Sequence, residues 1–148
     1  MQKIKETLMG AIFEVFEKMY YIFLEPLDAE EGEYDMTASI GFNGPANGEI
    51  RVSVSKKMAE TMARNMLNIE DADMTVKLME DCLKESANMI CGNFLHKLDA
   101  TQVYNLTIPT CDCNSVVVDH TETASPLRIA FESEGDGVGV SIRMTNQV

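Results

Sequence analysis

Two segments in which apolar and polar residues alternate, each interrupted by a turn, constrain the fold of this chain most strongly. Residues 34–42 and 50–54 alternate on either side of the turn sequence NGPANG, and residues 127–131 and 138–144 alternate on either side of GDG. Alternation places the apolar side chains on one face of a strand, and a short turn between two such strands is typical of an antiparallel hairpin. The sequence therefore predicts two hairpins, each with one buried face.

Three helices are predicted before and between these hairpins. Apolar residues recur at steps of three and four in 2–20 and again in 56–67, where Ser55 can cap the first turn. A third and longer helix opens at a cap within 71–75 and continues to about Leu98. Because the strands come in hairpins and the helices are grouped, we expect an α+β fold, with a long amphipathic helix pair packed on a mostly antiparallel sheet.

The length of the chain suits one domain. A chain of 148 residues and 16.5 kDa can bury a core without disulfides or a structural metal, so we expect a single domain covering 1–148. Two further segments, LTIPTCDC at 106–113 and the valine run at 116–118, are strand-like and would extend the sheet.

The composition argues against two classes of partner. With a formal net charge of −12 and a pI of about 4.5, the chain lacks the clustered lysine and arginine that bind nucleic-acid phosphates. No apolar run approaches the roughly 20 residues of a membrane helix. Acidic residues such as Glu6 and Glu14 interrupt the apolar N-terminus, and no small-residue cleavage site follows it. We expect a cytoplasmic protein without a nucleic-acid or membrane partner.

The four cysteines form no CxxC pair. Cys82 and Cys91 lie on the long helix, and Cys111 and Cys113 alternate in a strand-like segment. A zinc site made from the last two and His120 is disfavoured, because the spacing is poor and a fourth ligand is missing. We therefore expect reduced thiols and no metal site. Phosphate loops and the GxSxG and HExxH signatures are absent as well.

The long helix carries a line of polar or small residues at Asp81, Glu85, Asn88 and Gly92, which we call the stripe. At about 100° per residue the last three lie within roughly 40° of Asp81 on the helical wheel. The apolar residues of this helix lie on the opposite side, so the stripe is predicted to face out of the core. That apolar set is Val76, Met79, Leu83, Ala87, Ile90, Phe94 and Leu98.

Two features of the stripe are unfavourable for a helix. Asp81 and Glu85 are like charges one turn apart, and mid-helix Asn88 and Gly92 cost roughly 0.7 and 1 kcal/mol relative to alanine. The glycine would let another molecule's backbone approach closely. His96 lies beside the stripe and is expected to be flanking surface. Geometry alone leaves two readings open, a solvated face that tolerates an asparagine or a binding site.

At this stripe the sequence resembles the CheX/CheC/FliY family of chemotaxis phosphatases. The family signature is Asp or Ser, three residues, Glu, two residues and Asn, which here reads Asp81, Glu85 and Asn88. The continuation ESANMICGN, ending in Gly92 and Asn93, also fits the family. The order of helices, hairpins and the LTIPT segment is similar to the family layout over most of the chain. Because the signature occurs once, the chain is closest in layout to CheX, whereas CheC carries two copies.

The resemblance implies hydrolysis of the aspartyl phosphate of a CheY-like response regulator in two-component signalling. Asn88 would orient the attacking water, and Glu85 would pair with a lysine of the receiver domain. Asp81 and Gly92 would support these contacts with the partner. The chain itself would bind no cofactor, since the receiver would hold the Mg²⁺ ion.

The resemblance also implies a homodimer formed through the sheet, for which the strand GVGVSIRM at 137–144 or the segment 116–118 could offer an edge. Two other functions stay open at this point. One is a non-catalytic binding module for a receiver domain or a flagellar-switch partner. The other is a metal- or redox-sensing protein that uses the cysteines.

Overall fold

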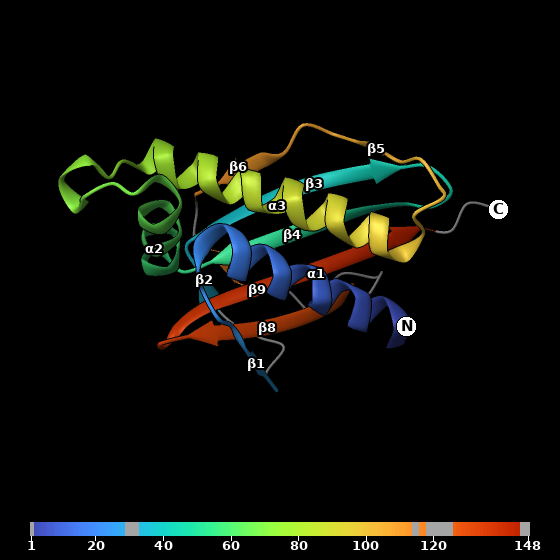
Figure 1. Ribbon diagram of the computed structural model, residues 1–148, viewed down its shortest axis with the longest axis horizontal. Coiled ribbons are helices and arrows are strands. Elements are labelled where there is room, and N and C mark those ends of the chain that lie inside the picture. The colour runs from blue at the N-terminus through green and yellow to red at the C-terminus, as the bar shows by residue number, and fades with distance from the viewer. Residues whose placement is uncertain (1, 29–32, 114–115, 118–125, 146–148) are drawn as a thin grey trace.

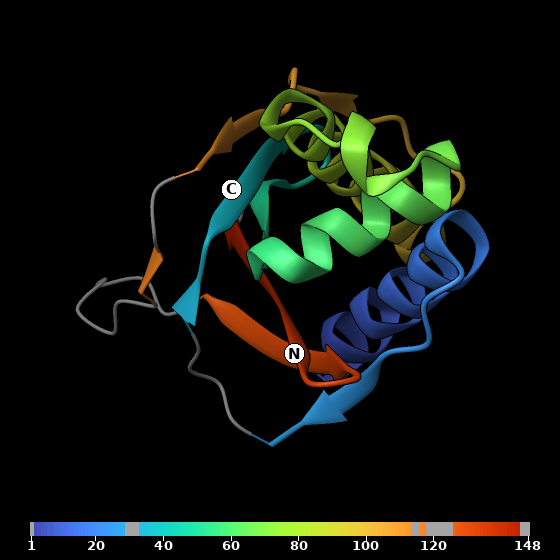
Figure 2. The same cartoon turned by 90° about the vertical axis from the view of Figure 1, so that its left-hand side faces the viewer.

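The computed structural model describes residues 2–28, 33–113, 116–117 and 126–145. A curved antiparallel sheet forms one layer, and three helices cover one face of it; α1 and α3 cross the sheet side by side, and α2 lies at one end (Figures 1 and 2). The predicted α+β class is therefore confirmed. The helices are α1 (Gln2–Tyr20), α2 (Lys56–Leu67) and α3 (Val76–Leu98), with a short 3₁₀ turn η1 (Asp71–Asp73) before α3.

The sheet has seven strands in the order β1-β8-β9-β4-β3-β5, with β6 also paired to β3, and every pairing is antiparallel. Both predicted hairpins are present, as β3–β4 and β8–β9. The strands are β1 (Glu25–Leu27), β3 (Met36–Asn43), β4 (Asn47–Val54), β5 (Asn105–Leu106), β6 (Thr110–Asp112), β8 (Leu127–Ser133) and β9 (Asp136–Thr145), while β2 (Glu33–Tyr34) pairs with β7 (Val116–Val117) separately.

Three details of the strands differ from the sequence expectation. The second hairpin turns at Glu134 and Gly135, whose φ angles of 51° and 85° match a type I′ turn, so the turn begins one residue before the predicted GDG and includes only its first glycine. The segment 106–113 is interrupted around Pro109, which has no N–H to donate to a strand ladder. Strand β9 lies between β4 and β8, so the expectation that GVGVSIRM offers a free edge is wrong.

The predicted helices and caps agree closely with the structure. The Ser55 hydroxyl accepts a hydrogen bond from the Met58 amide (3.1 Å), and the Thr75 hydroxyl accepts one from the Leu78 amide (3.2 Å). Each bond satisfies an amide that the first helical turn would otherwise leave free, so each cap fixes where its helix begins. None of the helices in the described part of the chain is long and apolar enough to cross a membrane.

Helix α3 is buried over a wider arc than predicted. Most of the expected inward set is buried, but Val76 is 53% exposed and Leu98 is only partly buried. The wider arc arises because α3 packs against α1 and α2 as well as against β3, β4 and β6. The additional buried residues are Cys82, Ser86, Cys91 and Leu95.

Helix α1 ends at a residue in the left-handed conformation. Tyr21 has a φ of 54°, and the next amide, that of Ile22, donates across the end of the helix to the carbonyl of Phe16, six residues earlier (3.0 Å). Glycine is usual at this position, because a Cβ atom there costs about 1–2 kcal/mol. Helix α2 ends similarly at Asn68 (φ 53°), a residue type that tolerates this conformation better.

Two glycines test the packing of the fold. A Cβ atom on Gly48 would lie 2.5 Å from the Arg143 carbonyl on β9, whereas one on Gly10 of α1 would meet nothing within 4 Å. We expect Gly48→Ala to lower the free energy of unfolding by about 1–3 kcal/mol through overpacking. The matched change Gly10→Ala should raise it by about 0.5–1 kcal/mol. Urea denaturation followed by circular dichroism measures both, and equal effects would contradict this packing.

Candidate functional site

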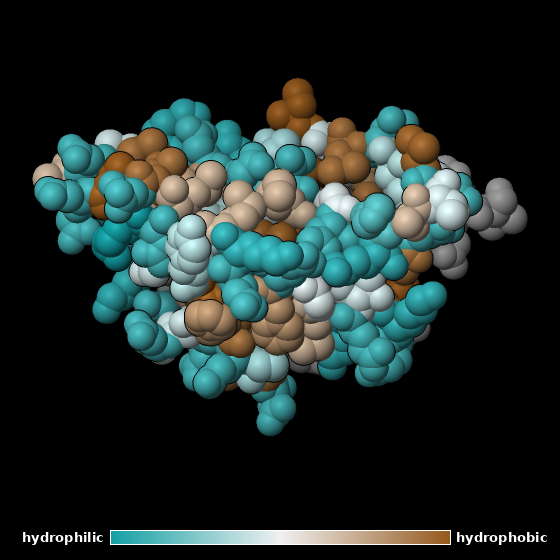
Figure 3. All heavy atoms as spheres, in the orientation of Figure 1, coloured by the Kyte–Doolittle hydropathy of each residue, from teal (hydrophilic) through white to brown (hydrophobic). Residues whose placement is uncertain are grey.

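The structure places the stripe on the solvent side of α3. Asp81 is exposed, whereas Glu85, Asn88 and Gly92 are half-buried. A Cβ atom built on Gly92 would meet nothing within 4 Å, so the surface beside it is open. His96 is also exposed, beyond the stripe. The surface over α1 and α3 mixes hydrophilic and hydrophobic side chains (Figure 3).

Glu85 and Asn88 are free to bind another molecule. Among the described residues, no hydrogen bond or ion pair engages the carboxylate of Glu85 or the amide of Asn88. Side chains three residues apart on a helix are neighbours, with Cβ atoms about 5–6 Å apart. The two groups can therefore enter one small cleft of a partner together.

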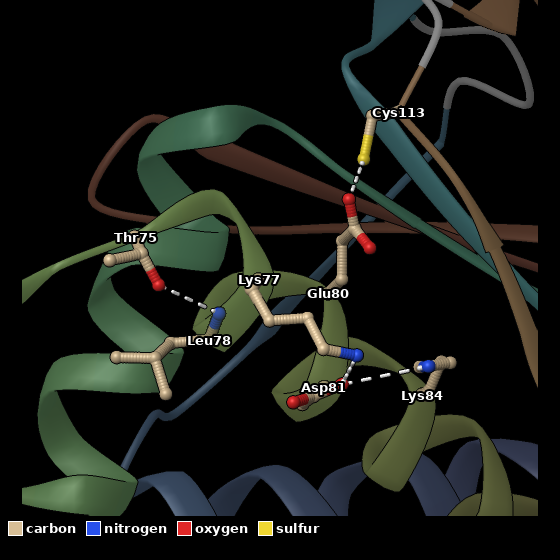
Figure 4. A network of polar contacts seen from close by, with 7 residues as sticks. All are labelled: Thr75, Lys77, Leu78, Glu80, Asp81, Lys84 and Cys113. Carbon is tan, nitrogen blue, oxygen red and sulfur yellow. Dashed lines mark hydrogen bonds and ion pairs between the residues drawn. The ribbon is translucent and has the colours of Figure 1, made fainter.

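Asp81 is held by two lysines of its own helix, as Figure 4 shows. Its Oδ1 atom lies 3.0 Å from Nζ of Lys77 and 3.5 Å from Nζ of Lys84. The hydrogen bond from Lys77 is the main cause that lowers the pKa of the Asp81 carboxyl. The repulsion expected between Asp81 and Glu85 is therefore offset by two lysines at i−4 and i+3, a pattern that is readable in the sequence.

A second carboxylate, that of Glu14 on α1, contacts α3 nearer its C-terminal end. Its oxygens accept hydrogen bonds from Lys18 (2.8 Å), from Asn93 (3.1 Å) and from Lys97 (3.0 Å). These partners, with Lys18 first, lower the pKa of Glu14 to about 2. The contacts with Asn93 and Lys97 link α1 to α3. No local pattern could have revealed them, because Glu14 and Asn93 are 79 residues apart.

Together these two carboxylates hold most of the lysines near the stripe. They bind four of the six lysines of α1 and α3. The other two, Lys3 and Lys5, lie at the start of α1, and Lys3 acts electrostatically on Asp99, just after the far end of α3. Among the described residues, Glu85 makes no ion pair with any lysine.

A buried tyrosine ties the end of α1 to the helical turn that carries the stripe. The Tyr20 hydroxyl donates to the carbonyl of Cys82 (3.0 Å), and Asn65 of α2 donates to the Tyr20 carbonyl (2.8 Å). Burial is the largest cause that raises the pKa of Tyr20, and the nearby Glu85 carboxylate adds to it. The tyrosine therefore stays neutral and serves as a structural link among the three helices.

The cysteines do not form a metal centre in the described residues, where no cluster of three or more His, Cys, Asp or Glu side chains could hold an ion. The Cys113 thiol donates to Glu80 (2.8 Å; Figure 4), and this bond raises the pKa of Cys113. Burial raises the pKa of Cys111 to about 12. His120 lies outside the described residues. Both thiols are thus protonated near neutral pH.

Comparison with known proteins defines the class. Residues 36–132, more than half of the chain, match the family model described as "Chemotaxis phosphatase CheX". The fold and the stripe together define a protein of the CheX/CheC/FliY type. Within that type, the chain belongs to the CheX family of chemotaxis phosphatases. A search of curated proteins finds no match.

Three solved structures share the fold. CheX from Desulfovibrio desulfuricans has a TM-score of 0.81 at 21% identity, with 97% of this chain and 99% of that chain covered. CheX from Vibrio vulnificus has a TM-score of 0.83 at 17% identity, with 96% of both chains covered. A CheX–CheY–BeF₃–Mg²⁺ complex from Borrelia burgdorferi has a TM-score of 0.76 at 21% identity, covering 95% of this chain and 97% of that one.

The contacts of Glu14 predict a specific dependence of stability on pH. Its pKa of about 2 in the folded protein lies below the ordinary value of 4.5, so its stabilising effect is present above pH 4.5 and is lost as the pH falls toward 2. The free energy of unfolding of Glu14→Gln should therefore differ most from the wild type at neutral pH, and the difference should shrink between pH 4.5 and 2. Urea denaturation at several pH values measures it.

The exposed Glu17→Gln on the same helix controls for the loss of one charge. A difference between Glu14→Gln and the wild type that stays constant over this pH range would show that the three contacts do not stabilise the carboxylate.

Proposed function

We propose that this chain hydrolyses the aspartyl phosphate of a CheY-like response regulator. One observation carries the proposal: a CheX-family chain presents a carboxylate and an amide side by side, at Glu85 and Asn88 on the solvent side of α3, and neither has a hydrogen-bond or ion-pair partner among the described residues. The Borrelia burgdorferi relative, which shares the fold, was crystallised as a complex with CheY, BeF₃ and Mg²⁺. A receiver domain is therefore a reasonable partner for the same face of this chain.

Asn88 would position the attacking water. Phosphoryl transfer asks little covalent chemistry of the protein and depends on holding the nucleophile in line with the phosphorus atom. The side-chain amide has both a donor and an acceptor, so it can hold one water molecule against the acyl phosphate. Being neutral, it neither repels the phosphate nor competes for the metal ion.

Glu85 would pair with a lysine of the receiver and hold the helix in register. The carboxylate is available for this contact because it makes no ion pair or hydrogen bond among the described residues, and no lysine lies three or four residues from it on α3. Gly92 leaves room for the partner's backbone to approach. Mg²⁺ held by the receiver would neutralise charge on the phosphate, while this chain supplies the positioned water.

Asn88→Ala should reduce the phosphatase rate by about 100-fold or more, to the receiver's own rate of phosphate loss, because the water is no longer held in line. The measurement is phosphate release from a CheY-like receiver phosphorylated with a small-molecule phosphodonor and supplied with Mg²⁺. The exposed amide Gln102, in the loop after α3, gives the matched control Gln102→Ala, which should retain the wild-type rate.

Full activity of Asn88→Ala would refute the water-positioning role. If the wild-type protein instead binds the phosphorylated receiver without changing its rate of phosphate loss, the chain is a binding module and not a hydrolase.

We also propose that the chain forms a homodimer through the β5–β6 edge of the sheet. The opposite edge, β1, contains Pro26, which cannot donate to a neighbouring strand, next to the acidic Glu25. Between β5 and β6, Ile108 is 88% exposed, an apolar side chain that a second copy could cover.

Light scattering at micromolar concentration should therefore report a dimer for the wild type and a monomer for Ile108→Asp, because the substitution would bury a charge in the interface. Val76→Asp, an exposed apolar residue at the start of α3, is the matched control and should remain dimeric. A monomeric wild-type protein would contradict the proposal.

A further inference from the structure

We propose that Tyr21 and Phe23, the two exposed aromatic residues that follow α1, form an aromatic anchor that docks the receiver domain beside the stripe. The inference rests on the proposed function, since it assigns a second contact surface for the same partner. The stripe would supply the chemistry, and the anchor would supply binding energy and partner choice.

Tyr21 is an unusual residue for the left-handed position that ends α1. Glycine is favoured at such a helix end, and the Tyr21 side chain is 71% exposed, so burial does not compensate for the strain. Strained residues of this kind cluster at functional sites. The strain is an observation separate from the exposure of the side chain.

In the segment after α1, buried and exposed side chains alternate. Ile22 and Leu24 are buried, whereas Tyr21 and Phe23 are 71% and 70% exposed. Tyrosine and phenylalanine are enriched at protein–protein interfaces, and large aromatic side chains often dominate the binding energy there. Two such residues exposed on one short segment form a surface of the kind that a partner covers.

The chain just before the anchor is hydrogen-bonded to the helix that carries the stripe. The preceding residue, Tyr20, donates to the carbonyl of Cys82 on α3 and accepts a hydrogen bond from Asn65 on α2. Cys82 lies between Asp81 and Glu85 in the sequence, and six residues, or about 9 Å along the helix axis, from Asn88. The residue that precedes the anchor is therefore tied to the helical turn that carries the stripe.

The size of an ordinary interface would let one receiver domain cover both the stripe and the anchor. A stable complex buries about 800 Å² on each partner, which is a disc of roughly 16 Å radius. A receiver whose catalytic pocket encloses Glu85 and Asn88 must cover a disc of this size around them, and the stripe alone is too narrow to fill it. Met89, 40% exposed next to Asn88, adds apolar surface on α3. The receiver is thus placed to reach the anchor.

The decisive variant is Tyr21→Gly, because docking and structural roles predict opposite outcomes. Glycine relieves the left-handed strain, so the melting temperature should rise by about 2–4 °C. Loss of the aromatic side chain should raise KM for the phosphorylated receiver about tenfold or more while kcat at saturation stays unchanged. Phe23→Ala should raise KM in the same way.

Asn68→Gly makes the same backbone change at the end of α2 and should leave KM unchanged, as should Val103→Ala, which removes an exposed aliphatic side chain from the loop after α3. An unchanged KM in Tyr21→Gly and Phe23→Ala would overturn the anchor, with the phosphatase itself still intact. If these two substitutions instead convert the dimer to a monomer and leave KM unchanged, the surface binds a second copy of the chain. That result would also overturn the anchor. Failure of the proposed function would instead appear as a wild-type protein without activity.

Discussion

The burial of α3 between the sheet and helices α1 and α2 determines which of its side chains can reach a partner. Leu83, Ile90 and Phe94 are fully buried, and each contributes on the order of 1.5–3 kcal/mol by leaving water. Turning the helix by one residue would expose part of this set and press carboxylates of the stripe toward the core, where an unpaired charge is very costly. The direction of Glu85 and Asn88 is therefore fixed by apolar packing on the far side of the helix, and these two side chains need no support of their own.

The ion pairs around the stripe link helical turns and helices. Asp81 binds two lysines of its own helix, whereas Glu14 of α1 binds Asn93 and Lys97 of α3. Glu85 has no lysine three or four residues away on α3, where helical neighbours lie. In the described part of the chain its carboxylate therefore makes no ion pair.

The periodic parts of the structure could be predicted from the sequence, and the parts that depend on distant partners could not. Alternation gave both hairpins, three- and four-residue steps gave the helices, and Ser55 and Thr75 are caps that a reader can find locally. Nothing local places β9 in the centre of the sheet, pairs β1 with β8 or brings Glu14 to Asn93. The helical wheel predicted that the stripe faces away from the core. The roles proposed for its residues came from the family resemblance.

In the proposed function, this chain would lend two side chains to another protein's active site, which would leave it little room to choose its partner there. Receiver pockets must keep the groups that hold Mg²⁺ and the acyl phosphate, so a carboxylate and an amide on one helical turn would fit many of them. Discrimination then has to come from surface outside the pocket, where partners differ. A rigid aromatic residue whose strained backbone weakens the fold is consistent with such a surface, because stability is given up where a contact with another molecule needs the side chain.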